Sequence, residues 1–285
     1  MEFQFYKYHA LGNDYIVIDP NKTKVNLSAE NIRLICHRNF GVGSDGILYG
    51  PVLEEDHTFS LKILNPDGSE AEKSGNGIRM FSRYLVDANY VTQKEFTLKT
   101  LGGAVQVELL DDKGDQIRVD MGTVTFASGQ IPVTGAPREV VNETMLIHNR
   151  RLAVTCLSIG NPHCVVMADE PSRETAVELG PVIETHPQFP NRINVQFLKV
   201  IDRKNIRIEI WERGAGYTLA SGSSSCAAAS AAYKLGLVDN EITVHMPGGI
   251  IKIDIRQDGH VFMTGPVTPV SKGVFADDFW NQIRS

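Results

Sequence analysis

The sequence is poor in cysteine and tryptophan, with 4 and 2 residues respectively among 285. The four cysteines, Cys36, Cys156, Cys164 and Cys226, have neither the spacing of a zinc site nor the density of a small disulfide-bonded protein. The eight histidines are also scattered rather than clustered as metal ligands would be. We therefore expect reduced thiols, no bound metal and a cytoplasmic location.

Long apolar runs and an excess of positive charge are also absent. No segment has the roughly eighteen consecutive apolar residues that a membrane-spanning helix needs, and the first residues do not resemble a secretory signal. The net charge of −6 disfavours binding to nucleic acid. The composition therefore indicates a globular protein with neither a membrane span nor a nucleic-acid partner.

What the sequence does contain is a set of landmarks that recur in the same order, roughly 147 residues apart. Residues 11–14, 74–77 and 97–103 of the first half are answered by 159–162, 221–224 and 243–249. This pattern predicts two similar domains, 1–123 and 124–266, with residues 267–285 completing the first. Small-molecule sites favour domain interfaces, so we expect a site in a cleft between the two.

Apolar periodicity predicts strands and helices in both halves, which indicates the α/β (α+β) class. Strands are predicted over 3–9, 15–19, 46–50, 59–64 and 96–100. Helices are predicted over 28–38 and 76–88, with counterparts over 173–179 and 225–235. The last of these is apolar nearly all round, which is typical of a helix buried inside a sheet.

Two short serine turns each precede a predicted helix. They read Ser74-Gly75-Asn76-Gly77 and Ser221-Gly222-Ser223-Ser224. The first turn of a helix presents unpaired N–H groups and the positive end of the helix dipole, which together suit a carboxylate or phosphate. One such turn in each half predicts that the protein binds a small anionic molecule.

Longer motifs surround both turns. Residues 65–79 read NPDGSEAEKSGNGIR, and residues 212–222 read ERGAGYTLASG. These two motifs resemble those of the diaminopimelate epimerase family. Further matching segments are residues 12–14, 41–46 and 160–163 and Asn194. The motifs occur in the same order as in the family, and the resemblance covers residues 8–266.

The resemblance implies two pseudo-symmetric domains, each a curved mixed sheet wrapped around a central helix. It also implies epimerisation or racemisation of an amino-acid α-carbon without pyridoxal phosphate or any other cofactor. In this chemistry one group removes the α-proton from one face and a second returns a proton to the opposite face. The implied partner is a small amino-acid substrate in lysine biosynthesis, and a homodimer is left open.

The resemblance assigns proton transfer to Ser74 and Ser221, where the family has cysteine, with His163 and Glu212 as nearby acid–base candidates. It assigns substrate binding to Asn13, Asn65, Gly75, Asn76, Asn161, Asn194, Glu212, Arg213, Gly222 and Ser223. A serine hydroxyl is a far weaker acid than a thiol and normally needs a neighbouring base. Tyr217 also stands where the family usually has an acid.

Other interpretations remain open at this stage. The same scaffold could carry a divergent isomerase or dehydratase that abstracts a proton from one face only, or an amino-acid-binding protein without catalysis. Replacement of cysteine by design is disfavoured, because Lys73 and residues 223–225 also depart from the family pattern. Taken singly, Asn13, Asn161 and Asn194 could be turn caps, and His163 could be a structural histidine.

Overall fold

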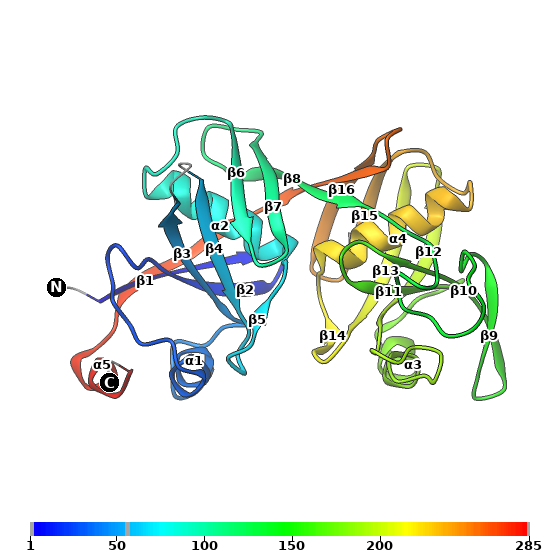
Figure 1. Ribbon diagram of the computed structural model, residues 1–285, viewed down its shortest axis with the longest axis horizontal. Helices are drawn as coiled ribbons and strands as arrows, with labels where there is room; N and C mark the ends of the chain where they lie inside the picture. Colours follow the sequence, from blue (N-terminus) through cyan, green and yellow to red (C-terminus); the bar gives the residue numbers. More distant parts are fainter. Residues whose placement is uncertain (1–2, 55–57, 284–285) are drawn as a thin grey trace. The chain divides into compact units, whose positions relative to one another are not determined.

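The computed structural model describes residues 3–54 and 58–283, which fold as two compact units (Figure 1). Unit 1 comprises the described residues of Met1–Val119 and Gly265–Ser285, and unit 2 comprises Asp120–Thr264. The strands β8 (Gln116–Thr123) and β17 (His260–Pro266) each continue from one unit into the other. The chain therefore passes between the units twice.

Unit 1 is a mixed sheet with helices. Its elements are β1 (Gln4–Ala10), β2 (Asn13–Ile18), α1 (Ala29–Cys36), β3 (Ile47–Leu53), β4 (Phe59–Leu64), β5 (Glu70–Ala71), α2 (Gly75–Asp87), β6 (Glu95–Thr100), β7 (Gly103–Leu109) and β8, followed at the C-terminal end by β18 (Thr268–Val274) and α5 (Asp277–Ile283). The β2–β3 and β4–β6 pairs are parallel, whereas β1–β2, β3–β4 and β6–β7 are antiparallel.

Unit 2 repeats this order element by element. After β9 (Glu143–Ile147), it has β10 (Arg150–Ser158), β11 (Pro162–Met167), α3 (Arg173–Glu184), β12 (Asn194–Asp202), β13 (Asn205–Glu212), β14 (Gly216–Thr218), α4 (Gly222–Lys234), β15 (Glu241–Met246), β16 (Gly249–Ile255) and β17. The β11–β12 and β13–β15 pairs are parallel, and β10–β11, β12–β13 and β15–β16 are antiparallel, as in unit 1. The predicted pair of similar mixed α/β domains is confirmed.

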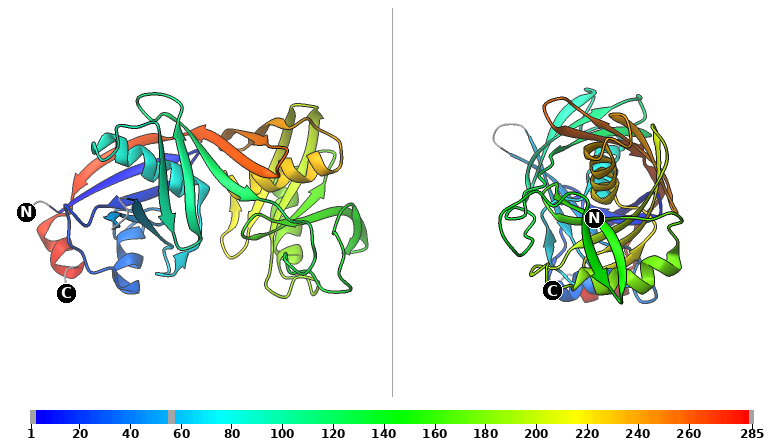
Figure 2. Two further views of the ribbon diagram at one scale, coloured as in Figure 1. Left: turned by 45° about the horizontal axis from the view of Figure 1, so that its top comes forward. Right: turned by 90° about the vertical axis from the view of Figure 1, so that its right-hand side faces the viewer.

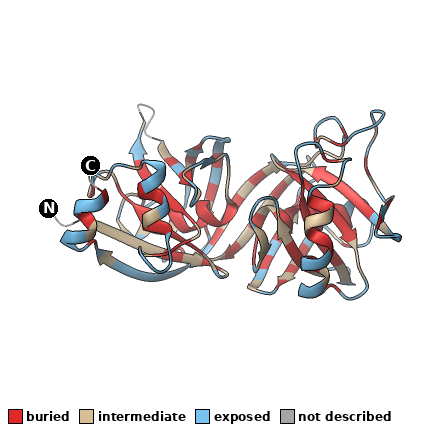
Figure 3. Ribbon diagram, turned by 90° about the horizontal axis from the view of Figure 1, so that it is seen from below, coloured by how far each residue is buried: buried red, intermediate tan, exposed pale blue. Residues whose placement is uncertain are grey.

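The helices α2 and α4 lie inside the curve of the strands of their own units (Figures 1 and 2). Ten of the thirteen residues of each are buried, compared with four of the eight in α1. Figure 3 shows the buried residues of the molecule in red. The alanines of α4 let strands approach it from all sides, as its sequence predicted. Each central helix begins directly after a serine, so this packing fixes the position of both serine turns.

The helix α3 differs from its prediction. Residues 173–179 were expected to be helical, but the helix continues through Pro181 to Glu184, so the predicted end is wrong. Gly180 lies against the Trp211 ring, where an added Cβ would come within 2.5 Å of Cγ. Glu184 accepts a hydrogen bond from Trp211 Nε1 at 2.7 Å. These contacts with β13 stabilise a last turn that proline alone would disfavour.

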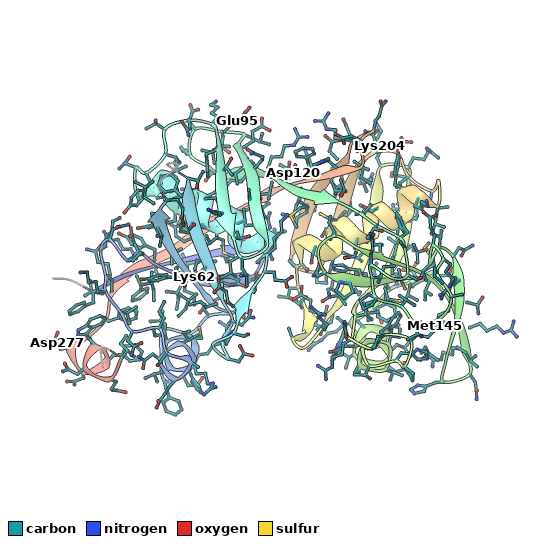
Figure 4. The ribbon with its side chains drawn as sticks, in the orientation of Figure 1. Lys62, Glu95, Asp120, Met145, Lys204 and Asp277 are labelled. Carbon is teal, nitrogen blue, oxygen red and sulfur yellow. The ribbon has the colours of Figure 1, made fainter. Side chains whose placement is uncertain are left out.

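Each unit also has an apolar cluster between its sheet and a second helix, α1 in unit 1 and α3 in unit 2. In unit 1, Ile32 and Ile35 of α1 pack against Ile16 of β2. In unit 2, Met145 of β9, labelled in Figure 4, packs with Ile183 of α3. Among the described residues, no helix is both long enough and apolar enough to cross a bilayer.

Candidate active site

The serine turn of unit 1 caps the central helix α2. Ser74 Oγ accepts a hydrogen bond from the N–H of Gly77 at 3.1 Å, and its backbone is extended, as at a helix N-cap. Gly77 is closely packed, because an added Cβ would lie 3.1 Å from Leu48 Cδ2 and 3.3 Å from Ser74 Oγ. Gly75 and Asn76, in the first turn of the helix, are buried. The first-turn N–H groups are therefore held in a fixed direction.

The Asn76 side chain lies in the middle of a chain of polar contacts. Its amide nitrogen donates to Asn13 Oδ1 at 3.1 Å, and its Oδ1 accepts from the Arg79 guanidinium at 2.6 Å. Asn13 in turn donates to Asp45 Oδ2 at 2.9 Å. Arg79 is fully buried and also donates to the Gly75 carbonyl at 3.4 Å. These contacts fix the orientation of both amides and place a positive charge behind the serine turn.

An ionic cluster anchors Asn13 from the other side. Asp14 forms ion pairs with Lys7 at 2.8 Å and with Arg38 at 2.7 Å, and Arg38 also pairs with Asp45 at 2.7 Å. Burial alone would raise the pKa of Asp14, but hydrogen bonds from Arg38 and Lys7 outweigh it and hold that pKa below its usual range. The start of β2, which carries Asn13, is thereby tied to β1, to the turn that follows α1 and to the loop before β3.

The structure places Asn65 in a tight loop between β4 and β5. Its side-chain amide donates to Ser69 Oγ at 3.0 Å, and its carbonyl accepts from the N–H of Gly68 at 2.9 Å. Gly68 has φ +92, a conformation that favours glycine. Asn65 therefore shapes the loop that leads to Ser74, whereas Asn13 and Asn76 contact each other.

Unit 2 repeats the serine turn with small differences. Ser221 caps α4 by accepting from the N–H of Ser224 at 3.4 Å, and it is almost fully buried. Asn161, which precedes β11 as Asn13 opens β2, donates to Ser223 Oγ at 3.4 Å. Gly222, between Ser221 and Ser223 in the sequence, is buried. The Asn161–Ser223 contact is the counterpart of the Asn13–Asn76 contact.

His163 is fully buried, and both of its ring nitrogens have partners in unit 2. Nε2 lies 2.9 Å from Asn161 Oδ1, and Nδ1 lies 3.1 Å from the side-chain nitrogen of Gln196, which also donates to Ser224 Oγ at 3.0 Å. These partners indicate a neutral ring that donates from Nε2 and accepts at Nδ1. Burial lowers the pKa of His163 to about 3, so the ring is uncharged near neutral pH.

Arg213 and Glu212 lie at the end of β13. The side-chain oxygen of Asn194 accepts from the N–H of Arg213 at 3.0 Å, while its amide donates to the Pro162 carbonyl at 2.8 Å. Arg213 is exposed, and its guanidinium donates to the carbonyl of Asn191, in the loop between α3 and β12, at 3.2 Å. Asn194 therefore connects the Arg213 turn to the strand that carries His163.

Tyr217 donates to Glu209 Oε2 at 2.8 Å, with the Arg173 guanidinium 5.3 Å from its ring centroid. Burial, followed by the contact with Glu209, raises the pKa of Tyr217 to about 12. The phenol is therefore protonated at neutral pH and does not replace the charge of an acid at this position.

Sequence reasoning missed three residues that orient the predicted ones: Asp45, Arg79 and Gln196. Asp45 and Arg79 lie within motifs noted in the sequence, but nothing in the pattern indicates that they contact Asn13 and Asn76. Gln196 carried no signal, because it reads as part of an apolar strand. Within the described ranges, no group of three His, Cys, Asp or Glu side chains is placed to hold a metal ion.

Comparisons with known proteins agree with these motifs. Residues 5–127 and 155–270 match the family model described as Diaminopimelate epimerase. The chain is 54% identical to "Diaminopimelate epimerase 2" of a Nostoc species over 277 residues, covering 97% of each chain. It is 39% identical to "Diaminopimelate epimerase" of a Synechocystis species, covering 96% of this chain and 99% of that one.

Solved structures with the same fold are more distant in sequence. A probable proline racemase from Agrobacterium radiobacter has a TM-score of 0.70 at 16% identity, covering 96% of this chain and 93% of that one. A hydroxyproline epimerase from Agrobacterium vitis has a TM-score of 0.68 at 14% identity, covering 98% of both. At these identities the similarity establishes the fold alone.

Proposed function

The chain belongs to the diaminopimelate epimerase family, and we propose that it is a cofactor-independent isomerase that inverts an α-carbon of diaminopimelate. The observation that carries this proposal is the duplicated site. In each unit a serine caps the central helix, and an asparagine next to a strand bonds the residue two positions after that serine. The two arrangements supply one candidate proton carrier in each unit, which is the number that two-face proton transfer requires.

The helix N-termini suit the carboxylate next to the reacting carbon. Removing the α-proton moves negative charge toward that carboxylate, and the N–H groups of Gly75 and Asn76 in α2, and of Gly222 and Ser223 in α4, are of the kind that stabilises such charge. Because these N–H groups belong to the first turns of packed helices, their direction is already set and little reorganisation is needed when the charge develops.

We assign proton transfer to Ser74 and Ser221, acting on opposite faces of the same carbon. Each hydroxyl oxygen accepts an N–H bond, from Gly77 and Ser224 respectively. Hydrogen bonds of this kind favour a deprotonated oxygen and lower its pKa. Inversion needs one proton acceptor and one donor. The accepting serine acts in its deprotonated form, having released its hydroxyl proton to solvent, and the other serine donates its hydroxyl proton, so the two exchange protonation states with each inversion.

The second amino-acid end of diaminopimelate is assigned to Arg213 and Glu212. A guanidinium can donate two parallel hydrogen bonds to a carboxylate, and a glutamate pairs with an ammonium. The Asn194 contact with the Arg213 N–H supports this role by fixing the backbone there. A substrate with two charged ends fits these two residues better than proline would.

The pathway, the location and the oligomeric state are proposed from the family resemblance and the composition. We place the reaction in cytoplasmic lysine biosynthesis, with no nucleic-acid partner, supported by free cysteines and negative net charge. We also propose that the protein forms a homodimer, and light scattering of the purified protein should give twice the mass of one chain. Activity should survive dialysis against a chelator and treatment with a carbonyl reagent that removes pyridoxal phosphate.

The purified protein should be incubated with LL-diaminopimelate in deuterium oxide. We expect meso product that carries deuterium at the inverted carbon. Exchange without inversion would replace the proposal with one-base chemistry, and binding with neither exchange nor inversion would indicate an amino-acid-binding protein. Ser82→Ala is the matched control for serine variants, because Ser82 also lies in α2 but donates to the Ile78 carbonyl.

A further inference from the structure

The turn that joins β13 to β14 presents Glu212 and Arg213. It is closed by a hydrogen bond from the N–H of Ala215 to the Glu212 carbonyl at 3.1 Å, and Gly214 has φ +77. Asn194 holds it on one side through the N–H of Arg213. A single contact of this kind would leave the turn free to pivot about it.

The carboxylate of Glu184 supplies the second attachment. Its Oε1 accepts from the N–H of Gly214 at 3.0 Å, and its Oε2 accepts from Trp211 Nε1 at 2.7 Å. Arg192 lies 3.3 Å from Oε1 and pairs with its charge. The Glu184 side chain is only 7% exposed, so one buried carboxylate bridges the residues on both sides of the Glu212–Arg213 pair.

The packing around this carboxylate leaves little room for movement. Trp211 is pressed against Gly180 of α3, where no side chain larger than hydrogen fits. Hydrogen bonds to a buried charged acceptor are stronger than neutral ones. Glu184 and its packing therefore hold three groups rigidly together beside the exposed Arg213: the end of α3, the Trp211 ring and the Gly214 amide.

We propose that Glu184 is a positioning residue that sets the direction in which Glu212 and Arg213 meet the distal end of the substrate. It acts through the N–H of Gly214 and the indole of Trp211. Only the identity of the ligand rests on the function proposed above, because the contacts of Glu184 with the turn lie within unit 2.

Glu184→Gln is the sharpest test. Glutamine keeps the volume but turns an NH2 group toward one of the two donors, so one of the two bonds is lost. We expect the KM and Kd for diaminopimelate to rise about tenfold, with kcat nearly unchanged, as when a uniform binding interaction is removed. The amide hydrogen of Gly214 should also exchange faster with solvent.

Two further variants serve as comparisons. Glu143→Gln removes a carboxylate elsewhere in unit 2 that pairs with Arg138, and it should leave KM and Gly214 exchange unchanged. Trp211→Phe removes one donor but leaves the Gly214 bond, so KM should rise by less than in Glu184→Gln. If Glu184→Gln does not fold, an unchanged KM in Trp211→Phe overturns the proposal.

The outcomes separate this inference from the proposed function. Lowered thermal stability with an unchanged KM would show a purely structural role for Glu184 and overturn the inference. If the unaltered protein neither binds nor converts diaminopimelate, the proposed function fails. Gly214 exchange then decides about Glu184, and unchanged protection in Glu184→Gln overturns its positioning role.

Discussion

Unit 1 places a buried guanidinium behind its capped serine, whereas unit 2 has a neutral cysteine at the matching position. Arg79 lies five residues after Ser74, and the same position after Ser221 is Cys226. Gln196 connects Ser224 of the unit 2 turn to the His163 ring, which burial keeps uncharged. The two backbone arrangements are alike, yet their electrostatic surroundings are not.

This difference indicates that the duplicated fold conserves geometry more strictly than charge. The N–H groups of a capped helix are set by backbone, so they survive sequence divergence in both units. The charges behind them come from side chains such as Arg79 and can change independently. We therefore expect Ser74 to stabilise negative charge better than Ser221, and the predictions below test that asymmetry.

The largest expected effect is on catalysis. Ser74→Cys combined with Ser221→Cys should raise kcat for diaminopimelate epimerisation by about 10²- to 10⁴-fold, because a thiol ionises far more readily than a hydroxyl. Each single variant should gain much less, since inversion needs a competent group on each face. Ser82→Cys is the control in steady-state assays. No gain in the double variant would refute the assignment of proton transfer to these two positions.

The next effect is on stability. Arg79→Leu should lower the free energy of unfolding by about 3 kcal/mol, because the carbonyl and amide oxygens that it bonds are left buried without that donor. Cys226→Ala, at the corresponding position of α4, should cost only about 1 kcal/mol, since it removes little more than one buried sulfur atom. Chemical denaturation of both variants measures the difference, and equal costs would contradict the asymmetry.

The units should also differ in acid sensitivity. The folded-state pKa of His163 is about 3, below the ordinary value near 6.5, so only the unfolded chain takes up this proton between those values. Its stabilising contribution is therefore lost as pH falls below about 6.5, by up to about 1.4 kcal/mol per pH unit. His163→Gln should flatten this dependence in denaturation measured from pH 7 to 5.

Unit 1 should respond at lower pH. The pKa of Asp14 is held below its ordinary range, so its contribution is complete above about pH 4 and is lost only as pH falls further. Hydrogen exchange at pH 5.5 should therefore show unit 2 opening more often than at pH 7, with unit 1 less changed. Equal loosening of both units would argue against this assignment.

The smallest expected effect concerns the two engineered thiols. The thiol in Ser74→Cys should have a pKa about one unit below that in Ser221→Cys, because Arg79 lies near the first and Cys226 near the second. Thiolate absorbance during pH titration, corrected for the native cysteines, measures both values. The reverse order would show that the surroundings of the unit 2 turn stabilise a thiolate better than those of the unit 1 turn.

Much of the fold could be predicted because the two halves carry matching local signals. Glycine turns and apolar runs recur at nearly one spacing, and they placed both central helices to within a few residues. The predicted end of α3 was wrong because a proline such as Pro181 usually terminates a helix when only its neighbours in the sequence are considered. The contacts of Gly180 and Glu184 with Trp211, about thirty residues away, decide the outcome.

For the candidate site too, local features could be predicted from the sequence and long-range contacts could not. Ser74 and Ser221 could be found from the sequence because a helix cap is a local feature. The orienting contacts could not, since Asn76 bonds Asn13 across 63 residues and His163 bonds Gln196 across 33. Nothing in the pattern around His163 shows that both of its nitrogens are engaged.

The most direct test of the central claim is the fate of the α-proton in Ser74→Ala and Ser221→Ala. Each variant should be incubated with LL-diaminopimelate in deuterium oxide, and deuterium and stereochemistry should be followed by NMR. We predict that each variant still binds the substrate but loses inversion by about 10²-fold or more. Inversion at the unaltered rate in either variant would contradict the assignment of one proton carrier to each unit.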